Sequence, residues 1–258
     1  ALVSVLAGLD AGVKRLSEIN MVLALGLMLF VILAGPTLEI FTGIFSSLFA
    51  YAVNVVPLSN WIGREDEGFM HDWTTFYWAW WISWSPFVGM FIARVSKGRT
   101  VREFITCVLI VPTLACVIWM AVFGGTAISQ FVNDGYTGVV DTVTNWQPEL
   151  SLFHMLEQLP LTQISSVIGI ILVIVFFVTS SDSGSLVIDT ITAGGKVDAP
   201  VAQRVFWCIF EGLVAITLLL GGGLGSLQAM AIATGFPFAI VLLAMMVSTL
   251  KGLRSEPT

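Results

Sequence analysis

The chain carries a dense run of aromatic residues inside a segment long enough to span a membrane. The run contains five of the nine tryptophans, namely Trp73, Trp78, Trp80, Trp81 and Trp84. Tryptophan normally concentrates at membrane interfaces and not through the middle of a span, so lipid contact does not explain the run. Aromatic ring faces in a dry site attract a quaternary ammonium group by cation–π interaction. The run therefore predicts a binding site for such a cation, and the alternative is a bulky helix that packs against its neighbours.

On a helix, these aromatic side chains fall into two neighbouring stripes. One stripe consists of Phe76, Trp80, Trp84, Phe87 and Phe91. The other, about 100° around the helix, consists of Trp73, Tyr77 and Trp81. Pro86 has no N–H group, so the carbonyl of Ile82 loses its helical partner, and we expect the helix to break there. Transporters use broken helices at membrane depth to build substrate sites.

A second candidate site follows the apolar segment 163–178, where a cluster of hydroxyl residues begins at Thr179. Phe176, Thr179, Ser180 and Ser183 share one helical face. Their oxygen atoms are hard ligands, which suit Na⁺. Asp182 is a carboxylate within or near the membrane, and such groups are functional candidates. The alternative is that the hydroxyls bond back to their own helix or to a neighbouring helix, and that Asp182 caps a helix end.

The composition identifies the fold class. The chain is 57% hydrophobic and 11% charged, with a mean hydropathy of +0.93, whereas a soluble domain carries roughly 25% charged residues. We therefore expect an all-α polytopic membrane protein. Stretches of about 20 apolar residues predict six transmembrane helices, near 19–42, 73–96, 103–124, 163–190, 203–221 and 226–250. The stretch 43–57 after Pro36 fits an amphipathic helix in the interface, and the glycine run 221–225 fits a tight turn.

The basic residues predict the orientation. Of the 11 Lys and Arg residues, six alternating spans place all but Arg64 on one side, which is a positive-inside signal. Acidic residues gather on the other side, in the predicted external segments 58–72 and 125–162. Residues 1–18 and 251–258 are then a cytoplasmic loop and a cytoplasmic tail. The whole chain, 1–258, is expected to be a single transmembrane region.

Other functional classes find little support in the residue types. The three cysteines lie in apolar runs without paired spacing, and the two histidines are far apart, so we expect no disulfide and no metal site. A membrane-embedded enzyme would depend on Asp182, Asp189 and Glu211, which have no metal-ligand pattern. We expect no enzyme activity, no cofactor and no nucleic-acid partner.

Two motifs resemble those of a known family. The segment 76–102, FYWAWWISWSPFVGMFIARVSKGRTVR, resembles the signature of the betaine/choline/carnitine transporter (BCCT) family, and Thr179 to Ser185 resembles its TSxDSG element. Members of that family are about twice this length and hold two inverted five-helix repeats in a LeuT-like arrangement. The resemblance implies that this chain is the C-terminal half. Segment 19–57 would hold the last span of the first repeat plus the interfacial helix, and 73–250 the second repeat. The missing N-terminal half would be its partner.

The resemblance also implies roles for individual residues. Trp81 resembles the tryptophan of the aromatic box around the ammonium head. Trp80 and Trp84, with Phe76 and Tyr77 beside them, resemble the aromatic residues that line the substrate path. Phe87 matches a residue near one sodium site, and a second sodium site would involve Phe176, Thr179 and Ser180. Sodium is favoured over a proton as the coupling ion.

The expected function is secondary active transport of glycine betaine, choline or carnitine by alternating access. By resemblance, the protein would be a multi-pass homotrimer in the lipid bilayer of the bacterial cytoplasmic (inner) membrane, with a role in osmoprotection. The alternatives are a transporter of the same scaffold for another small solute, such as an amino acid, and a tryptophan-rich membrane subunit that does not transport.

Overall fold

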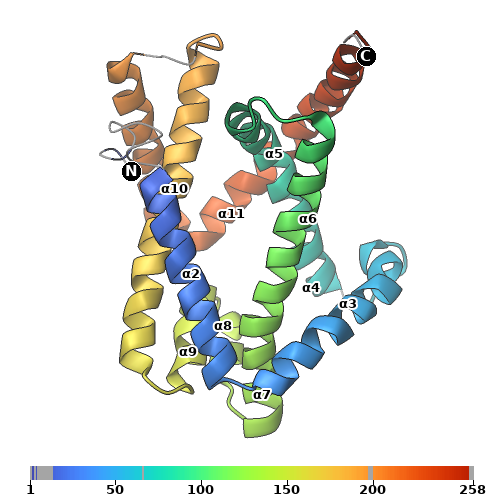
Figure 1. Ribbon diagram of the computed structural model, residues 1–258, viewed down its shortest axis with the longest axis vertical. Helices are drawn as coiled ribbons and strands as arrows, with labels where there is room; N and C mark the ends of the chain where they lie inside the picture. The colour runs from blue at the N-terminus through green and yellow to red at the C-terminus, as the bar shows by residue number, and fades with distance from the viewer. Residues whose placement is uncertain (1, 3, 5–13, 66, 197–199, 256–258) are drawn as a thin grey trace. The chain divides into compact units, whose positions relative to one another are not determined.

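The computed structural model describes residues 2, 4, 14–65, 67–196 and 200–255, and every regular element among them is a helix. This confirms the all-α class (Figure 1). Five helical segments are long and apolar enough to cross a membrane, namely α2 (Lys14–Ala34), α3 (Thr37–Ser59), Val101–Asp134, α10 (Thr162–Thr192) and α11 (Val201–Ser255). The aromatic helix α5 (Phe76–Val95) is not among these five segments, although its 20 residues have the length of a span.

The chain divides into two compact units. The first unit comprises Ala1–Gly8, Leu58–Lys97 and Ser181–Thr258, and the second comprises Leu9–Pro57 and Gly98–Ser180. Helix α10 therefore begins in the second unit and ends in the first. The aromatic helix α5 belongs to the first unit, with α11.

The second unit has an apolar core made by α2, α3, α9 (Ser151–Glu157), α10 and the π-helical turn Met120–Gly124. Its buried members are Leu27, Val31, Ile40, Val122, Met155, Leu156, Leu159 and Leu172. Helix α6 (Val101–Trp119) runs into the π-helical turn, and Thr100 caps its start in a reciprocal capping box with Glu103. The capping box explains why α6 begins directly after the basic loop.

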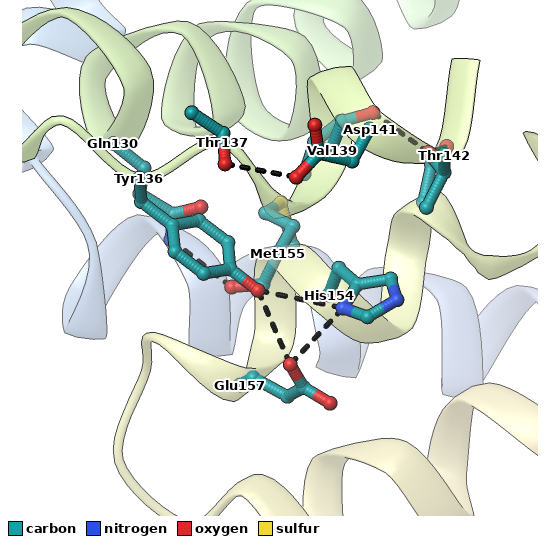
Figure 2. A network of polar contacts seen from close by, with 10 residues as sticks. Gln130, Tyr136, Thr137, Val139, Asp141, Thr142, His154, Met155 and Glu157 are labelled. Atoms are coloured by element: carbon teal, nitrogen blue, oxygen red, sulfur yellow. Dashed lines mark hydrogen bonds and ion pairs between the residues drawn. The ribbon is translucent and has the colours of Figure 1, made fainter. Parts of the chain in front are cut away.

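The predicted external loop 125–162 is folded. It forms α7 (Gly125–Asp134), α8 (Gly138–Thr144), a 3₁₀ turn (Pro148–Leu150) and α9, and these helices lie together at the end of the unit where α2 ends (Figure 1). Polar contacts hold them to one another (Figure 2). Tyr136 donates to Glu157 Oε2 at 3.2 Å, and His154 Nδ1 lies 3.1 Å from the same oxygen. Burial and the neighbouring Glu157 raise the pKa of the Tyr136 hydroxyl, so this group remains a donor.

Helix α3 is longer than the amphipathic helix expected at 43–57, since it begins directly after Pro36 and has 23 residues. At its start, Thr37 Oγ1 donates to the carbonyl of Ile32 at 2.6 Å. Asn133 Nδ2 of α7 donates to both carboxylate oxygens of Glu39, at 3.1 and 3.3 Å. These contacts fix the first turns of α3, while most of the helix is exposed. Its placement in the membrane interface stays a prediction.

In the first unit, α5 packs along α11. A short helix, α4 (Glu67–Phe69), and a π-helical turn, Met70–Thr75, lead into α5. The closest approach is at Gly235, where a Cβ atom would lie 3.1 Å from the carbonyl oxygen of Ala79. Further along, the rings of Phe87 and Phe238 lie 5.3 Å apart. Small residues on both helices therefore allow the two backbones to come together, as is common between membrane helices.

The predicted break at Pro86 is wrong, because α5 continues through Pro86 to Val95. A proline removes one N–H donor, and membrane helices tolerate that loss. Next to the Ile82 carbonyl that Pro86 frees, Ser83 donates to the carbonyl of Trp80 at 2.9 Å, and Ser85 donates to that of Trp81. The departure from α-helical geometry lies before α5, in the π-helical turn Met70–Thr75.

The spans predicted at 203–221 and 226–250 are both part of α11, whose backbone leaves helical geometry at Gly222 and Gly223. A straight helix of these 55 residues would be roughly 80 Å long, against a hydrocarbon core of about 30 Å. Gly223 has φ +63° and ψ −150°, which only glycine adopts readily. The glycine run thus provides the turn that the sequence predicts.

Candidate functional site

Helix α5 presents its tryptophans away from the helix that it packs on. The side that meets α11 carries Ala79, buried Pro86 and Phe87. The indoles of Trp80, Trp81 and Trp84 are 45%, 58% and 47% exposed. A row of exposed indoles is unusual for a packing helix, because such a helix would bury its large rings. These side chains are therefore available to a ligand or to another part of the protein.

The predicted substrate residues form two groups of rings. Tyr77 and Trp80 lie 5.7 Å apart between centroids, and Phe76 contacts both of them, at 5.4 and 5.5 Å. Trp73 stacks on Tyr77 at 6.2 Å. Trp81 and Trp84 form a separate edge-to-face pair at 5.9 Å. Among the described residues no ring contact joins the two groups, so the structure gathers the residues on one helix but not into one cluster.

One helix supplies only one wall of a cation site. A cage that holds an ammonium group needs ring faces from several directions. On α5 the rings all project from a single backbone, whose opposite side is occupied by α11. The remaining wall must come from outside α5.

The serines next to the tryptophans were not predicted as functional residues. The hydroxyls of Ser83 and Ser85 donate to the carbonyls of Trp80 and Trp81. These carbonyls lie two residues and one residue before that of Ile82, which Pro86 leaves without its helical donor. They support the backbone that positions these indoles. The pattern Ser83-Trp84-Ser85-Pro86 could have indicated this role, because serine commonly bonds back to a helix next to proline.

The residues predicted for the two sodium sites belong to different units, Phe87 to the first and Phe176, Thr179 and Ser180 to the second. Thr179 Oγ1 donates to the carbonyls of Val175 and Phe176, each at 3.0 Å. This back-bonding is the packing alternative, although the hydroxyl oxygen keeps lone pairs that a cation could use. Ser180 and Phe176 are exposed, and Phe87 contacts Phe238 in the first unit. The sodium roles stay predictions.

The described residues contain no group of three or more His, Cys, Asp or Glu side chains that could hold a metal ion.

Two of the three acidic residues of α10 and α11 have hydrogen-bond partners that the sequence did not indicate. Ser185 Oγ donates to Glu211 Oε2 at 2.9 Å. Asp189 Oδ2 accepts from Arg204 Nε at 3.1 Å. Asp182 is fully buried on the same stretch of α10. These contacts join α10 to α11 within the first unit.

Comparison with known proteins gives consistent matches along the chain. The signature of "BCCT, betaine/carnitine/choline family transporter" matches residues 1–258. A glycine betaine/proline/choline transporter of Vibrio parahaemolyticus is 65% identical over 257 residues, which cover 100% of this chain and 46% of the relative. Glycine betaine transporter 1 of the same organism is 57% identical, over 99% of this chain and 49% of the relative. A glycine betaine transporter of Acinetobacter baylyi is 42% identical, over 100% of this chain and 39% of the relative.

The chain thus spans about half the length of the curated relatives that it matches most closely among these. The family and these relatives are transporters and not enzymes. The apolar helices agree with a multi-pass membrane protein. On the match over its full length, this chain belongs to the betaine/carnitine/choline transporter family.

Proposed function

We propose that the full-length protein takes up a quaternary-ammonium solute, namely glycine betaine, choline or carnitine, by secondary active transport. The observation that carries the proposal is the row of exposed indoles on α5, whose opposite side is packed on α11. A methylated ammonium group cannot donate a hydrogen bond, so ring faces are its natural partners. The names of the relatives, which specify glycine betaine and choline, support the same substrate class.

In this proposal Trp81 contacts the ammonium head directly. Trp80 and Trp84 line the path by which the solute leaves, with Phe76 and Tyr77 beside them. The contacts of Tyr77 and Phe76 with Trp80 hold that indole in place. The second wall of the site comes from the part of the transporter that this chain does not contain.

Transport is coupled to a cation, and sodium is favoured over a proton. Thr179 and Ser180, with Phe176, contribute to one sodium site, and Phe87 lies near another. The lone pairs of the Thr179 hydroxyl support this role, because its proton is already donated to the helix backbone. A cation bound there shifts the protein toward the conformation that binds substrate.

The chain forms the second half of a LeuT-like inverted-repeat scaffold. The last helix of the first repeat is α2, and α5, α6, α10 and the two parts of α11 are the five helices of the second. Access alternates as one helix bundle rocks against the other. The protein works as a homotrimer in the bacterial cytoplasmic membrane, where it serves osmoprotection.

A second candidate cargo is an amino acid, and one observation favours it specifically. The most similar Vibrio relative named above is a glycine betaine/proline/choline transporter. Proline is a zwitterion with a cationic nitrogen, so an aromatic wall can hold it more weakly than a trimethylated head. Proline is therefore expected as a low-affinity substrate of the same site.

A binding titration on the purified full-length protein tests the proposal. Glycine betaine, choline, carnitine and proline are each added in sodium and in potassium buffer, and intrinsic tryptophan fluorescence is recorded. The expected result is a saturable change with the methylated solutes, strengthened by sodium, and a weaker response to proline. Equal responses to proline and glycine betaine would favour the amino-acid alternative, and no response to any of them would contradict the proposal.

A further inference from the structure

A buried polar stripe runs along the last turns of α10. Asp182, Ser185 and Asp189 follow the i, i+3, i+7 spacing that places side chains on one helical face. Their exposed fractions are 0%, 1% and 2%. A carboxylate that is shielded from water in this way needs a charged or hydrogen-bonding partner, or else a proton.

Two members of the stripe have partners on α11. Asp189 pairs with Arg204, with 3.1 Å between Oδ2 and Nε. Ser185 donates to Glu211 Oε2 at 2.9 Å, while Glu211 Oε1 is buried and has no hydrogen-bond partner in the described part of the chain. The contact between the two helices thus contains one ion pair and one carboxylate that is only half satisfied.

Asp182 is different, because neither of its carboxylate oxygens makes a well-formed hydrogen bond, and the described polar group beside it is the buried hydroxyl of Ser4. Its burial is complete within this chain, so a side chain from elsewhere in the transporter would have to displace the residues that cover it. A metal ion would need several further oxygen ligands around it. A proton requires neither additional space nor additional ligands.

The other ionisable groups nearby do not supply a compensating charge. The described ionisable residues of this part of α10 and α11 are Asp189, Arg204, Cys208 and Glu211. The positive charge of Arg204 is already balanced by Asp189. The described polar group beside Asp182 is the Ser4 hydroxyl, which can donate a hydrogen bond but carries no charge.

We infer that this stripe is a proton-binding site, with Asp182 as the residue that holds the proton and Glu211 as the neighbouring acid. The ligand is a hydrogen ion, and its uptake leaves the contact between α10 and α11 without an unpaired charge. Deprotonation of Asp182 would place a bare carboxylate in that contact and weaken it. The site is independent of which solute the protein transports.

The test compares Asp182→Asn with Asp189→Asn in the purified full-length transporter. Asparagine has the shape of a protonated aspartate, so Asp182→Asn is expected to fold and to melt at the wild-type temperature. Asp189→Asn leaves Arg204 unpaired and is expected to melt earlier. Infrared spectra at neutral pH should show the carbonyl stretch of a protonated carboxylic acid in the wild type and in Asp189→Asn, and its loss in Asp182→Asn.

The pH dependence has a defined sign. Stability that depends on a proton bound in the folded state is present at low pH and is lost as the pH rises through the titration of the site. The melting temperature of the wild type should therefore fall at alkaline pH more steeply than that of Asp182→Asn. The inference is overturned if the wild type shows no protonated acid band, if Asp182→Asn keeps the band, or if Asp182→Asn loses stability or folding as Asp189→Asn does.

Discussion

The proposed contact between Trp81 and the ammonium head makes the substrate affinity depend on a ring face, and a leucine at this position tests that dependence. Leucine keeps an apolar side chain but removes the π face. Cation–π contact in a desolvated site contributes about 2 kcal/mol or more, and a tenfold change in affinity corresponds to about 1.4 kcal/mol. We expect Trp81→Leu to raise the glycine betaine concentration for half-maximal uptake by about tenfold or more.

Trp78 provides the matched control, because it is equally an exposed indole of α5, at 64% exposure, but takes part in no described ring contact. Trp78→Leu should leave uptake close to that of the wild type. Equal losses in both variants would mean that the tryptophans act through packing. If the glycine betaine concentration for half-maximal uptake by Trp81→Leu stays within about twofold of the wild-type value, Trp81 does not contact the ammonium head, since the expected cation–π contribution is much larger.

The cation site makes a separate prediction for the pair Thr179 and Ser180. Replacing both with alanine removes their hydroxyl oxygens, and the helix loses the back-bonding of Thr179. We expect a higher sodium concentration for half-maximal uptake and a smaller effect on substrate binding at saturating sodium. Coupling between such sites is typically about 1–3 kcal/mol. Uptake by the wild type that ignores sodium and follows a proton gradient would show that these hydroxyls only stabilise the helix.

The position of α5 depends on the absence of a side chain at Gly235. A methyl group there would lie 3.1 Å from the Ala79 carbonyl oxygen and 3.2 Å from the Ala79 Cβ atom. Gly235→Ala should therefore separate α5 from α11 and lower stability by about 1–3 kcal/mol, as overpacking does. Thermal unfolding in detergent measures the change.

Gly252 is the control for that substitution, because it lies in the same helix with open space around it. Gly252→Ala should be neutral or stabilising, by up to about 1 kcal/mol from helix propensity. If the two variants melt alike, the close approach of α5 and α11 is not what Gly235 provides.

The turn within α11 depends on the backbone conformation of Gly223. Its φ of +63° with ψ of −150° lies in a region that an L-residue with a side chain avoids. Gly223→Ala should cost about 1–3 kcal/mol and reduce the amount of folded protein in the membrane. Gly221→Ala, without positive φ and with open space around it, should express normally. Equal expression of the two variants would contradict the requirement for glycine at 223.

Much of the element pattern could be predicted from the sequence, because apolar length and glycine placement act locally. The helices and the turn at Gly222 and Gly223 follow from these signals. The continuity of α5 through Pro86 could not be predicted, because the sequence shows the donor lost at Pro86 but not the packing of α5 along α11. The contact between Ser185 and Glu211 also escaped prediction, since it joins residues 26 positions apart whose side chains meet only after folding.

At the scale of the whole molecule, we propose that the chain contributes one aromatic wall of the substrate site and a part of the scaffold. Its curated relatives are about twice as long, and in inverted-repeat transporters the substrate site lies between the two repeats. Exposed indoles on α5 agree with a surface that another part of the protein covers. We therefore expect residues 1–258 alone to be unable to transport.

Reconstitution into proteoliposomes tests this claim most directly. Radiolabelled glycine betaine is offered under an inward sodium gradient to liposomes that contain residues 1–258 alone, the full-length protein, or residues 1–258 together with the remaining N-terminal part. We predict concentrative uptake with the full-length protein and with the two parts combined, and none with residues 1–258 alone. Concentrative uptake by residues 1–258 alone, or its absence from the full-length protein, would contradict the account.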